Sequence, residues 1–256
     1  DRNYGPGSDG ILFGPLQAGS GPDLRIYNPD GSEAEKSGNG LRIFAWYLHE
    51  RGLLPPQGRA LTTKGGTVFV RVMDADRRNV EVDMGSPSFL ATDIGLRTDA
   101  PELVGVTRVF DDQALDITCV SMGNPHCVIL MPGADEAIAR QLGPLVESDP
   151  LFIHRTNVQF MSPVSRNEIR IQIWERGAGY TLASGSSSCA AASAARRMGL
   201  VDDDVTVIMP GGSLQVSFRE GHAYLVGPVE PVCAGVLLEP LAGRVGLAKP
   251  AGGSTI

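Results

Sequence analysis

Apolar and polar residues alternate along much of the chain, as they do in strands with one buried face. The clearest cases are residues 67–72, Thr-Val-Phe-Val-Arg-Val, and 79–84, Asn-Val-Glu-Val-Asp-Met. The polar residues at 74–78 favour a turn, so this pair predicts a β-hairpin. Further strands are predicted at 11–13, 24–27, 116–122, 127–131, 158–161, 168–174, 205–209, 214–218 and 223–226.

Three segments have apolar residues at helical spacing or are rich in alanine, and they predict helices. The first is 40–51, where Leu41, Phe44 and Leu48 fall on one face. The second is 134–142, which we expect to end before a Gly-Pro pair. The third is 188–199, with two arginines in its last turn and a glycine as its stop signal.

The order of landmarks repeats within the chain. A Ser-Gly turn before a helix occurs at 37 and again 147 residues later, at 184. A Gly-Gly pair follows at 65 and again 146 residues on, and a hairpin-ending glycine follows at 85 and again 142 residues on. The order predicts two related lobes, 1–105 and 106–240, and a tail at 241–256. A strand-rich chain could also repeat the same kinds of turn by chance. This alternative stays open because few of the paired positions carry the same residue.

This pattern predicts an α/β (α+β) fold of two pseudo-symmetric lobes. Each lobe would be a mixed or antiparallel sheet or barrel around a central helix, with the active site in the cleft between them. Two serine hydroxyls and two helix N-termini would then face one ligand. Because helix starts offer unpaired N–H groups to an anion, the arrangement favours a carboxylate-bearing ligand.

Composition narrows the function classes. The 256 residues include 22 Lys and Arg against 29 Asp and Glu, a formal charge of −7 with no basic run, so nucleic acid and anionic membranes are poor candidates as partners. No apolar run reaches the roughly 18 residues of a membrane helix, and no leader is evident, so we expect a cytoplasmic protein. The four cysteines lack zinc-site spacing; we predict no metal site and expect buried, reduced thiols.

Few motifs favour a particular chemistry by themselves. Residues 5–10, Gly-Pro-Gly-Ser-Asp-Gly, match a dinucleotide-binding string, but no strand precedes them and they are better interpreted as a turn. Asn124 and His126 flank a proline after a strand and are either a structural turn or ligand contacts. Glu175 and Arg176 are either a surface ion pair or a grip on an ammonium and a carboxylate.

Five blocks in this order resemble the diaminopimelate epimerase family, over nearly the whole chain. They are Tyr-Asn-Pro-Asp-Gly-Ser at 27–32, Ser-Gly-Asn-Gly at 37–40, Met-Gly-Asn-Pro-His at 122–126, Glu-Arg-Gly-Ala-Gly at 175–179 and Ser-Gly-Ser at 184–186. The resemblance implies two pseudo-symmetric lobes, often a homodimer, and no cofactor. It also implies interconversion of LL- and meso-2,6-diaminopimelate, a small-molecule substrate, in bacterial lysine and cell-wall synthesis.

The resemblance assigns roles residue by residue. By this resemblance, the substrate-binding asparagines are Asn28, Asn124 and Asn157, and the residues that hold the reacting α-amino and carboxylate groups are Glu175 and Arg176. The backbone donors to carboxylates look like Gly38, Asn39, Gly185 and Ser186. The histidine beside the reacting carbon looks like His126.

Two features depart from the family. Ser37 and Ser184 stand where the family has its acid/base cysteines, and the family's opening strand and Gly-Asn-Asp-Phe turn are absent from this sequence. A thiol has a pKa of about 8.5, and a serine hydroxyl is a far weaker acid; a gap of about five pKa units adds roughly 7 kcal/mol to the barrier. That is on the order of 10⁵ in rate, and a helix dipole offsets at most about 2 kcal/mol. We therefore expect a feeble epimerase.

Three hypotheses follow from the serines. The cysteines of an epimerase were replaced on purpose; or the chain is a paralogous isomerase or lyase acting on another amino acid, with Glu175 or His126 as its base; or it is a catalytically silent amino-acid-binding protein.

Overall fold

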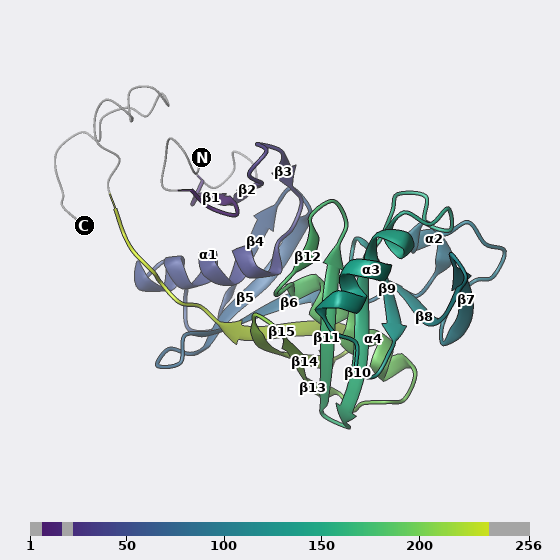
Figure 1. Ribbon diagram of the computed structural model, residues 1–256. Coiled ribbons are helices and arrows are strands. Elements are labelled where there is room, and N and C mark those ends of the chain that lie inside the picture. Colours follow the sequence, from purple (N-terminus) through teal and green to yellow (C-terminus); the bar gives the residue numbers. More distant parts are fainter. Residues whose placement is uncertain (1–6, 17–22, 236–256) are drawn as a thin grey trace.

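The computed structural model describes residues 7–16 and 23–235. The predicted tail at 241–256 and the first two residues of the glycine-rich string lie outside these ranges. The described chain is α+β and consists mainly of sheet (Figure 1). Its elements are β1 (Ile11–Phe13), β2 (Arg25–Tyr27), β3 (Glu33–Ala34), α1 (Gly38–Glu50), β4 (Arg59–Thr63), β5 (Gly66–Asp74), β6 (Asn79–Gly85), α2 (Ala91–Ile94), β7 (Val106–Phe110), β8 (Gln113–Ser121), β9 (Pro125–Leu130), α3 (Glu136–Glu147), β10 (Asn157–Ser165), β11 (Glu168–Glu175), β12 (Gly179–Thr181), α4 (Gly185–Arg197), β13 (Asp204–Met209), β14 (Gly212–Arg219) and β15 (His222–Pro228).

A twelve-stranded sheet connects the two halves of the chain. Its order is β4-β5-β6-β15-β14-β13-β11-β10-β9-β8-β7, with β12 paired to β11, and a separate three-stranded sheet is formed by β1, β2 and β3. The predicted hairpin at 67–84 is confirmed as β5 and β6. Helix α1 packs on β5 and β6, while α3 packs on β11 and β12. Since β6 pairs with β15, the sheet is continuous across the predicted boundary at 105 and 106.

Two helices begin earlier than predicted. Helix α1 starts at Gly38 rather than at 40, and α4 starts at Gly185 rather than at 188. In each case the preceding serine is the N-cap, and its hydroxyl accepts a hydrogen bond from a backbone N–H three residues on. Such a cap satisfies one of the free donors of the first turn, so the helix extends back to the serine.

The predicted end of the helix at 134–142 is wrong. Helix α3 continues through the Gly-Pro pair to Glu147. At Gly143 a Cβ atom would lie only 2.5 Å from Cγ of Trp174. The glycine is therefore a close-packing position inside the helix, where β11 approaches it, and not a stop signal.

The predicted repeat has detailed structural counterparts. The pairing Tyr27↔Glu33 in β2 and β3 recurs 147 residues later as Trp174↔Tyr180 in β11 and β12. In both Gly-Gly turns the first glycine donates its N–H to the residue two before the N-cap: Gly65 to the Glu35 carbonyl at 2.9 Å, and Gly211 to the Leu182 carbonyl at 2.8 Å. The third landmark differs, because Gly85 has a φ of 85° and the equivalent glycine at 227 has no positive φ.

The larger hydrophobic core is shared between the two halves of the chain. It combines apolar residues of α1, β5 and β6 with those of α4 and β13–β15. Helix α4 is buried on nearly all sides; its alanines at 190, 191, 192, 194 and 195 are fully inaccessible. Short side chains let this helix lie among several strands, as the helix labelled α4 does in Figure 1. A second core forms where α2 and α3 pack on β7–β10.

Gly143→Ala should destabilise the protein by about 1–3 kcal/mol, although alanine is the better helix former, because the added methyl group overlaps Trp174. Urea unfolding measures the change. Gln141→Ala, at an exposed position of the same helix, is the matched control and should be neutral. A Gly143→Ala variant as stable as the parent would contradict the close-packing explanation.

Candidate active site

The two N-caps have the same local geometry. Ser37 has φ −143° and ψ 116°, and Ser184 has φ −152° and ψ 128°. The Ser37 hydroxyl accepts from the Gly40 N–H at 3.1 Å, and the Ser184 hydroxyl accepts from the Ser187 N–H at 3.5 Å. Each hydroxyl is thus held at the start of its own helix.

The N-termini of α1 and α4 touch at their first residues. A Cβ atom built on Gly38 would lie 3.5 Å from Cα of Gly185, and one built on Gly185 would lie 3.4 Å from Cα of Gly38. Leu225 of β15 packs against both glycines. Two sets of free N–H donors therefore meet at one place, which is a ready-made environment for an anion.

Two buried polar side chains, Gln159 and His126, each make one side-chain hydrogen bond, one to α4 and one within the Asn-Pro-His turn. Gln159 of β10 donates from Nε2 to the Ser187 hydroxyl at 3.0 Å, and Nε2 of His126 lies 3.0 Å from Oδ1 of Asn124. His126 and Gln159 are both fully inaccessible. Burial lowers the pKa of His126 to about 3, so the ring is neutral and is a poor base.

Asn157 joins this turn to the loop that carries the charged pair. Its Nδ2 donates to the Pro125 carbonyl at 2.9 Å, and its Oδ1 accepts the Arg176 backbone N–H at 3.0 Å. The Arg176 side chain donates to the His154 carbonyl, and Glu175 accepts from the Thr181 hydroxyl at 3.2 Å. Glu175 and Arg176 form no ion pair with each other, so the surface-ion-pair interpretation is wrong.

Asn28 lies apart from these contacts. Its Nδ2 donates to the Ser32 hydroxyl at 3.0 Å within its own exposed turn at the end of β2. Asn39 lies in the first turn of α1, where its Oδ1 accepts from Arg42 at 3.0 Å. Ser186, at the equivalent place in α4, is partly buried.

Sequence reasoning missed the residue that anchors the charged loop. Glu147, at the end of α3, is buried, and its Oε1 accepts the Gly177 N–H at 2.8 Å and contacts Arg155 at 2.6 Å. Its Oε2 accepts from the Trp174 indole at 2.7 Å. No sequence signal links it to a loop some 30 residues away, whereas Gln159 was visible as a polar residue within an apolar strand.

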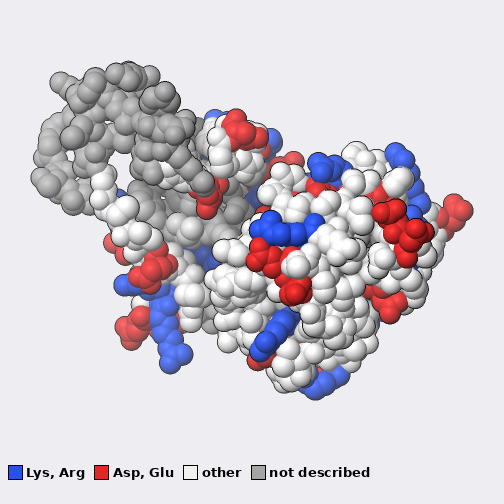
Figure 2. Space-filling model, viewed as in Figure 1, with Lys and Arg blue, Asp and Glu red and all other residues white. Residues whose placement is uncertain are grey.

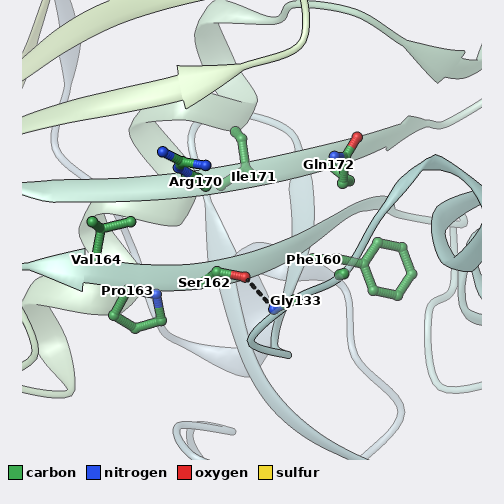
Figure 3. Close-up of a pocket in the computed structure, with 9 residues that line it drawn as sticks. Gly133, Phe160, Ser162, Pro163, Val164, Arg170, Ile171 and Gln172 are labelled. Atoms are coloured by element: carbon green, nitrogen blue, oxygen red, sulfur yellow. Dashed lines mark hydrogen bonds between the residues drawn. The ribbon is translucent and has the colours of Figure 1, made fainter.

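The cavity along β10 and β11 is separate from the predicted site residues. A cavity of about 420 Å³ lies along β10 and β11, lined by Gly133, Phe160, Ser162 and Arg170 among others, and includes none of the predicted site residues (Figure 3). Charges of both signs are interspersed on the face seen in Figure 2.

Across residues 7–16 and 23–235, no group of three or more His, Cys, Asp or Glu could hold a metal ion. In the same ranges no helix combines the length and apolar character needed to cross a membrane.

The expectation of buried thiols is confirmed for three cysteines and wrong for the fourth. Cys119, Cys127 and Cys189 are free and buried, but Cys233 is exposed. Cys233 follows the end of β15, where the described chain leaves the sheet.

A family model described as diaminopimelate epimerase matches residues 1–90 and 118–232. A diaminopimelate epimerase 2 from Nostoc sp. is 47% identical over 238 residues, covering 92% of this chain and 83% of the relative. A diaminopimelate epimerase from Pelotomaculum thermopropionicum is 38% identical, covering 92% of this chain and 85% of the relative.

Solved structures share the fold at low identity. A probable proline racemase from Agrobacterium radiobacter superposes with a TM-score of 0.59 at 17% identity, over 90% of this chain and 76% of that chain. A predicted epimerase from Pseudomonas aeruginosa gives 0.57 at 18% identity, over 84% and 79%. These similarities confirm the α+β fold class.

Glu147→Gln should destabilise the protein by about 1.5–3 kcal/mol and loosen the 175–179 loop, because it removes the buried charge that accepts two hydrogen bonds and pairs with Arg155. Urea unfolding and the rate of tryptic cleavage after Arg176 measure the two effects. Arg155→Gln is the control; that arginine is half exposed and its removal should cost less than about 1 kcal/mol. Unchanged cleavage in Glu147→Gln would show that the loop does not depend on this carboxylate.

Proposed function

This chain belongs to the diaminopimelate epimerase family, and we propose that it binds 2,6-diaminopimelate where the N-termini of α1 and α4 meet. The observation that carries the proposal is the contact between Gly38 and Gly185, which puts two Ser-capped turns of the same geometry beside each other. The proposed reaction is the cofactor-independent interconversion of the LL and meso forms. A place in lysine and peptidoglycan synthesis, a dimeric state and a cytoplasmic location belong to the same proposal.

Each group has a definite task in this scheme. The N–H groups of 38–39 and 185–186 bind substrate carboxylates at the two helix starts. Glu175 and Arg176 hold the reacting α-ammonium and carboxylate groups. Asn28, Asn124 and Asn157 bind the rest of the substrate, with His126 holding Asn124 by its hydrogen bond.

The hydroxyls at 37 and 184 take the two acid/base positions, one removing the Cα proton and the other returning it on the opposite face. Both are weak acids, and each already accepts a hydrogen bond from its own helix. An accepted hydrogen bond stabilises an alkoxide only modestly against a gap of about 7 kcal/mol. The proposal is therefore an epimerase site with impaired chemistry.

The alternative of a paralogous isomerase or lyase needs either His126 or Glu175 as its base, and His126 is poorly suited to that role. His126 is inaccessible, and its lowered pKa makes it a poor proton acceptor. Glu175, which is partly buried, would have to act as the base instead. A silent binding protein would use the same carboxylate-binding turns without turnover.

Deuterium exchange at Cα of diaminopimelate in D₂O, followed by proton NMR, tests these proposals. The chain as it stands should exchange negligibly. The double variant Ser37→Cys, Ser184→Cys should exchange faster by on the order of 10⁵, because thiols have the lower pKa.

The single variants are the matched controls and should remain slow, since each lacks one partner of the pair. If the double variant exchanges nothing but still binds diaminopimelate by calorimetry, the epimerase proposal fails and the binding-protein hypothesis stands. Turnover of another amino acid by the unaltered chain would support the paralogue.

A further inference from the structure

Two fully buried side chains each present an atom without a hydrogen-bond partner. Within residues 7–16 and 23–235, neither Nδ1 of His126 nor Oε1 of Gln159 makes a hydrogen bond, and both side chains are inaccessible. Buried polar atoms in folded proteins are nearly always paired. These two atoms are complementary, because a ring nitrogen can carry the proton that an amide oxygen accepts.

The strand pairing places the two side chains on one face of the sheet. Strands β9 and β10 are parallel, with His126 opposite Asn157 and Val128 opposite Gln159. Because residues two apart in a strand point to the same side, His126 and Gln159 are diagonal neighbours. Both lie on the face that carries α4, where Gln159 meets Ser187.

Gln159 acts on the imidazole ring in the direction expected of an acceptor. Burial lowers the pKa of His126 to about 3, and the side chain of Gln159 shifts that pKa the other way. A hydrogen bond that favours the charged form of a group has this effect. An amide oxygen that accepts a ring N–H favours the imidazolium, whereas an amide N–H that donates to the ring would not.

Helix α4 orients the amide of Gln159. Its Nε2 donates to the Ser187 hydroxyl at 3.0 Å, which leaves Oε1 as the atom available to His126. The turn of α1 has no such hydroxyl: at the repeat distance of 147 residues, Ser187 corresponds to Gly40, where a Cβ would lie 2.8 Å from Leu12. Since both helices start with the same cap geometry, the hydroxyl at 187 is not needed for capping.

The state of His126 determines how Asn124 is held. A neutral ring carries a single N–H, so a proton on Nδ1 leaves Nε2 as an acceptor. Nε2 lies 3.0 Å from the amide of Asn124. A half-turn of that amide exchanges Oδ1 and Nδ2 at nearly unchanged shape, and the NH₂ group then donates to Nε2.

We propose that Gln159 is a positioning residue that accepts the Nδ1 proton of His126, fixes the ring tautomer and thereby leaves the carbonyl oxygen of Asn124 free for a ligand. In this arrangement Asn124 is an acceptor for an ammonium group and not a donor to a carboxylate. The use of Asn124 by the substrate rests on the proposed function. The tautomer is a property of the ligand-free protein.

The tautomer is read from the ¹⁵N chemical shifts of the imidazole ring at pH 7, in protein labelled at histidine. Protonated and unprotonated ring nitrogens differ widely in shift, and a His126→Asn variant identifies which of the four histidines gives the signal. The proton should be on Nδ1 and absent from Nε2. A ring protonated at Nε2 would overturn the proposal.

Two variants at 159 separate positioning from packing. Gln159→Met removes the acceptor at similar volume, so the proton should move to Nε2, where Oδ1 of Asn124 accepts it. Gln159→Glu retains an acceptor and should keep a proton on Nδ1. If Gln159→Met leaves the proton on Nδ1, Gln159 does not set the tautomer; if that variant does not fold, the parent and Gln159→Glu still decide.

Gln172→Met is the matched control. Gln172 is a partly buried glutamine of the neighbouring strand β11, paired with Phe160 and therefore on the opposite face of the sheet. The same exchange of side chains there should leave the shifts of His126 unchanged. A change of tautomer in this control would show that any altered packing moves the proton, and the proposal would fail.

Calorimetry with two ligands tests the consequence for Asn124. Gln159→Met should weaken binding of diaminopimelate by about tenfold or more, as expected when a hydrogen bond to a charged group is lost. Pimelate, which has the same two carboxylates and no ammonium group, should bind the parent and the variant about equally. An equal loss for both ligands would contradict the acceptor role of Asn124.

The outcome is separable from that of the proposed function. A ring protonated at Nδ1 in a protein that does not bind diaminopimelate would leave the role of Gln159 intact and end the proposed function. Binding of diaminopimelate with the proton on Nε2 would do the reverse.

Discussion

The contact between Gly38 and Gly185 is the constraint on which the candidate site depends. Backbone meets backbone there at a distance that any side chain would fill, so both helices must begin without one. Leu225 closes the contact from the side of β15, whose pairing with β6 joins the two halves of the sheet. The continuous sheet thus fixes where the two helices start, and the glycines allow those starts to touch.

Bringing two helix N-termini together concentrates positive partial charge, and the side chain of Arg42 adds a full positive charge to it. His126 is neutral, Asn124 and Gln159 are uncharged, and Arg42 is a buried cation that pairs with no carboxylate of residues 7–16 and 23–235. The buried carboxylate of Glu147 is occupied by the Gly177 N–H of the loop it anchors, by the Trp174 indole and by Arg155. An anionic ligand is the natural complement of such a site.

Much of the fold was predictable because local patterns and tertiary environment agree. The alternation at 67–84 gives a hairpin because one face of that hairpin is core. The Ser-Gly turns gave the helix starts to within three residues, and the repeat predicted that the turns at 37 and 184 belong together. The end of α3 was not predictable, because a Gly-Pro pair is ordinarily a stop and only the approach of Trp174 turns that glycine into a packing position.

By itself the sequence determined most of the strands, the three longer helices, the repeat, the serines at 37 and 184, and the membership in a family of epimerases. It could not pair Glu147, Gln159 or Ser187 with the groups that they contact, because those partners lie in other elements and no local periodicity relates them. Nor could it reveal that Arg42 is an unpaired cation, since an arginine at that place in a helix is ordinarily solvated. Tertiary structure decided these points because burial removes water, and only then does it matter which polar group lies within hydrogen-bonding distance of which.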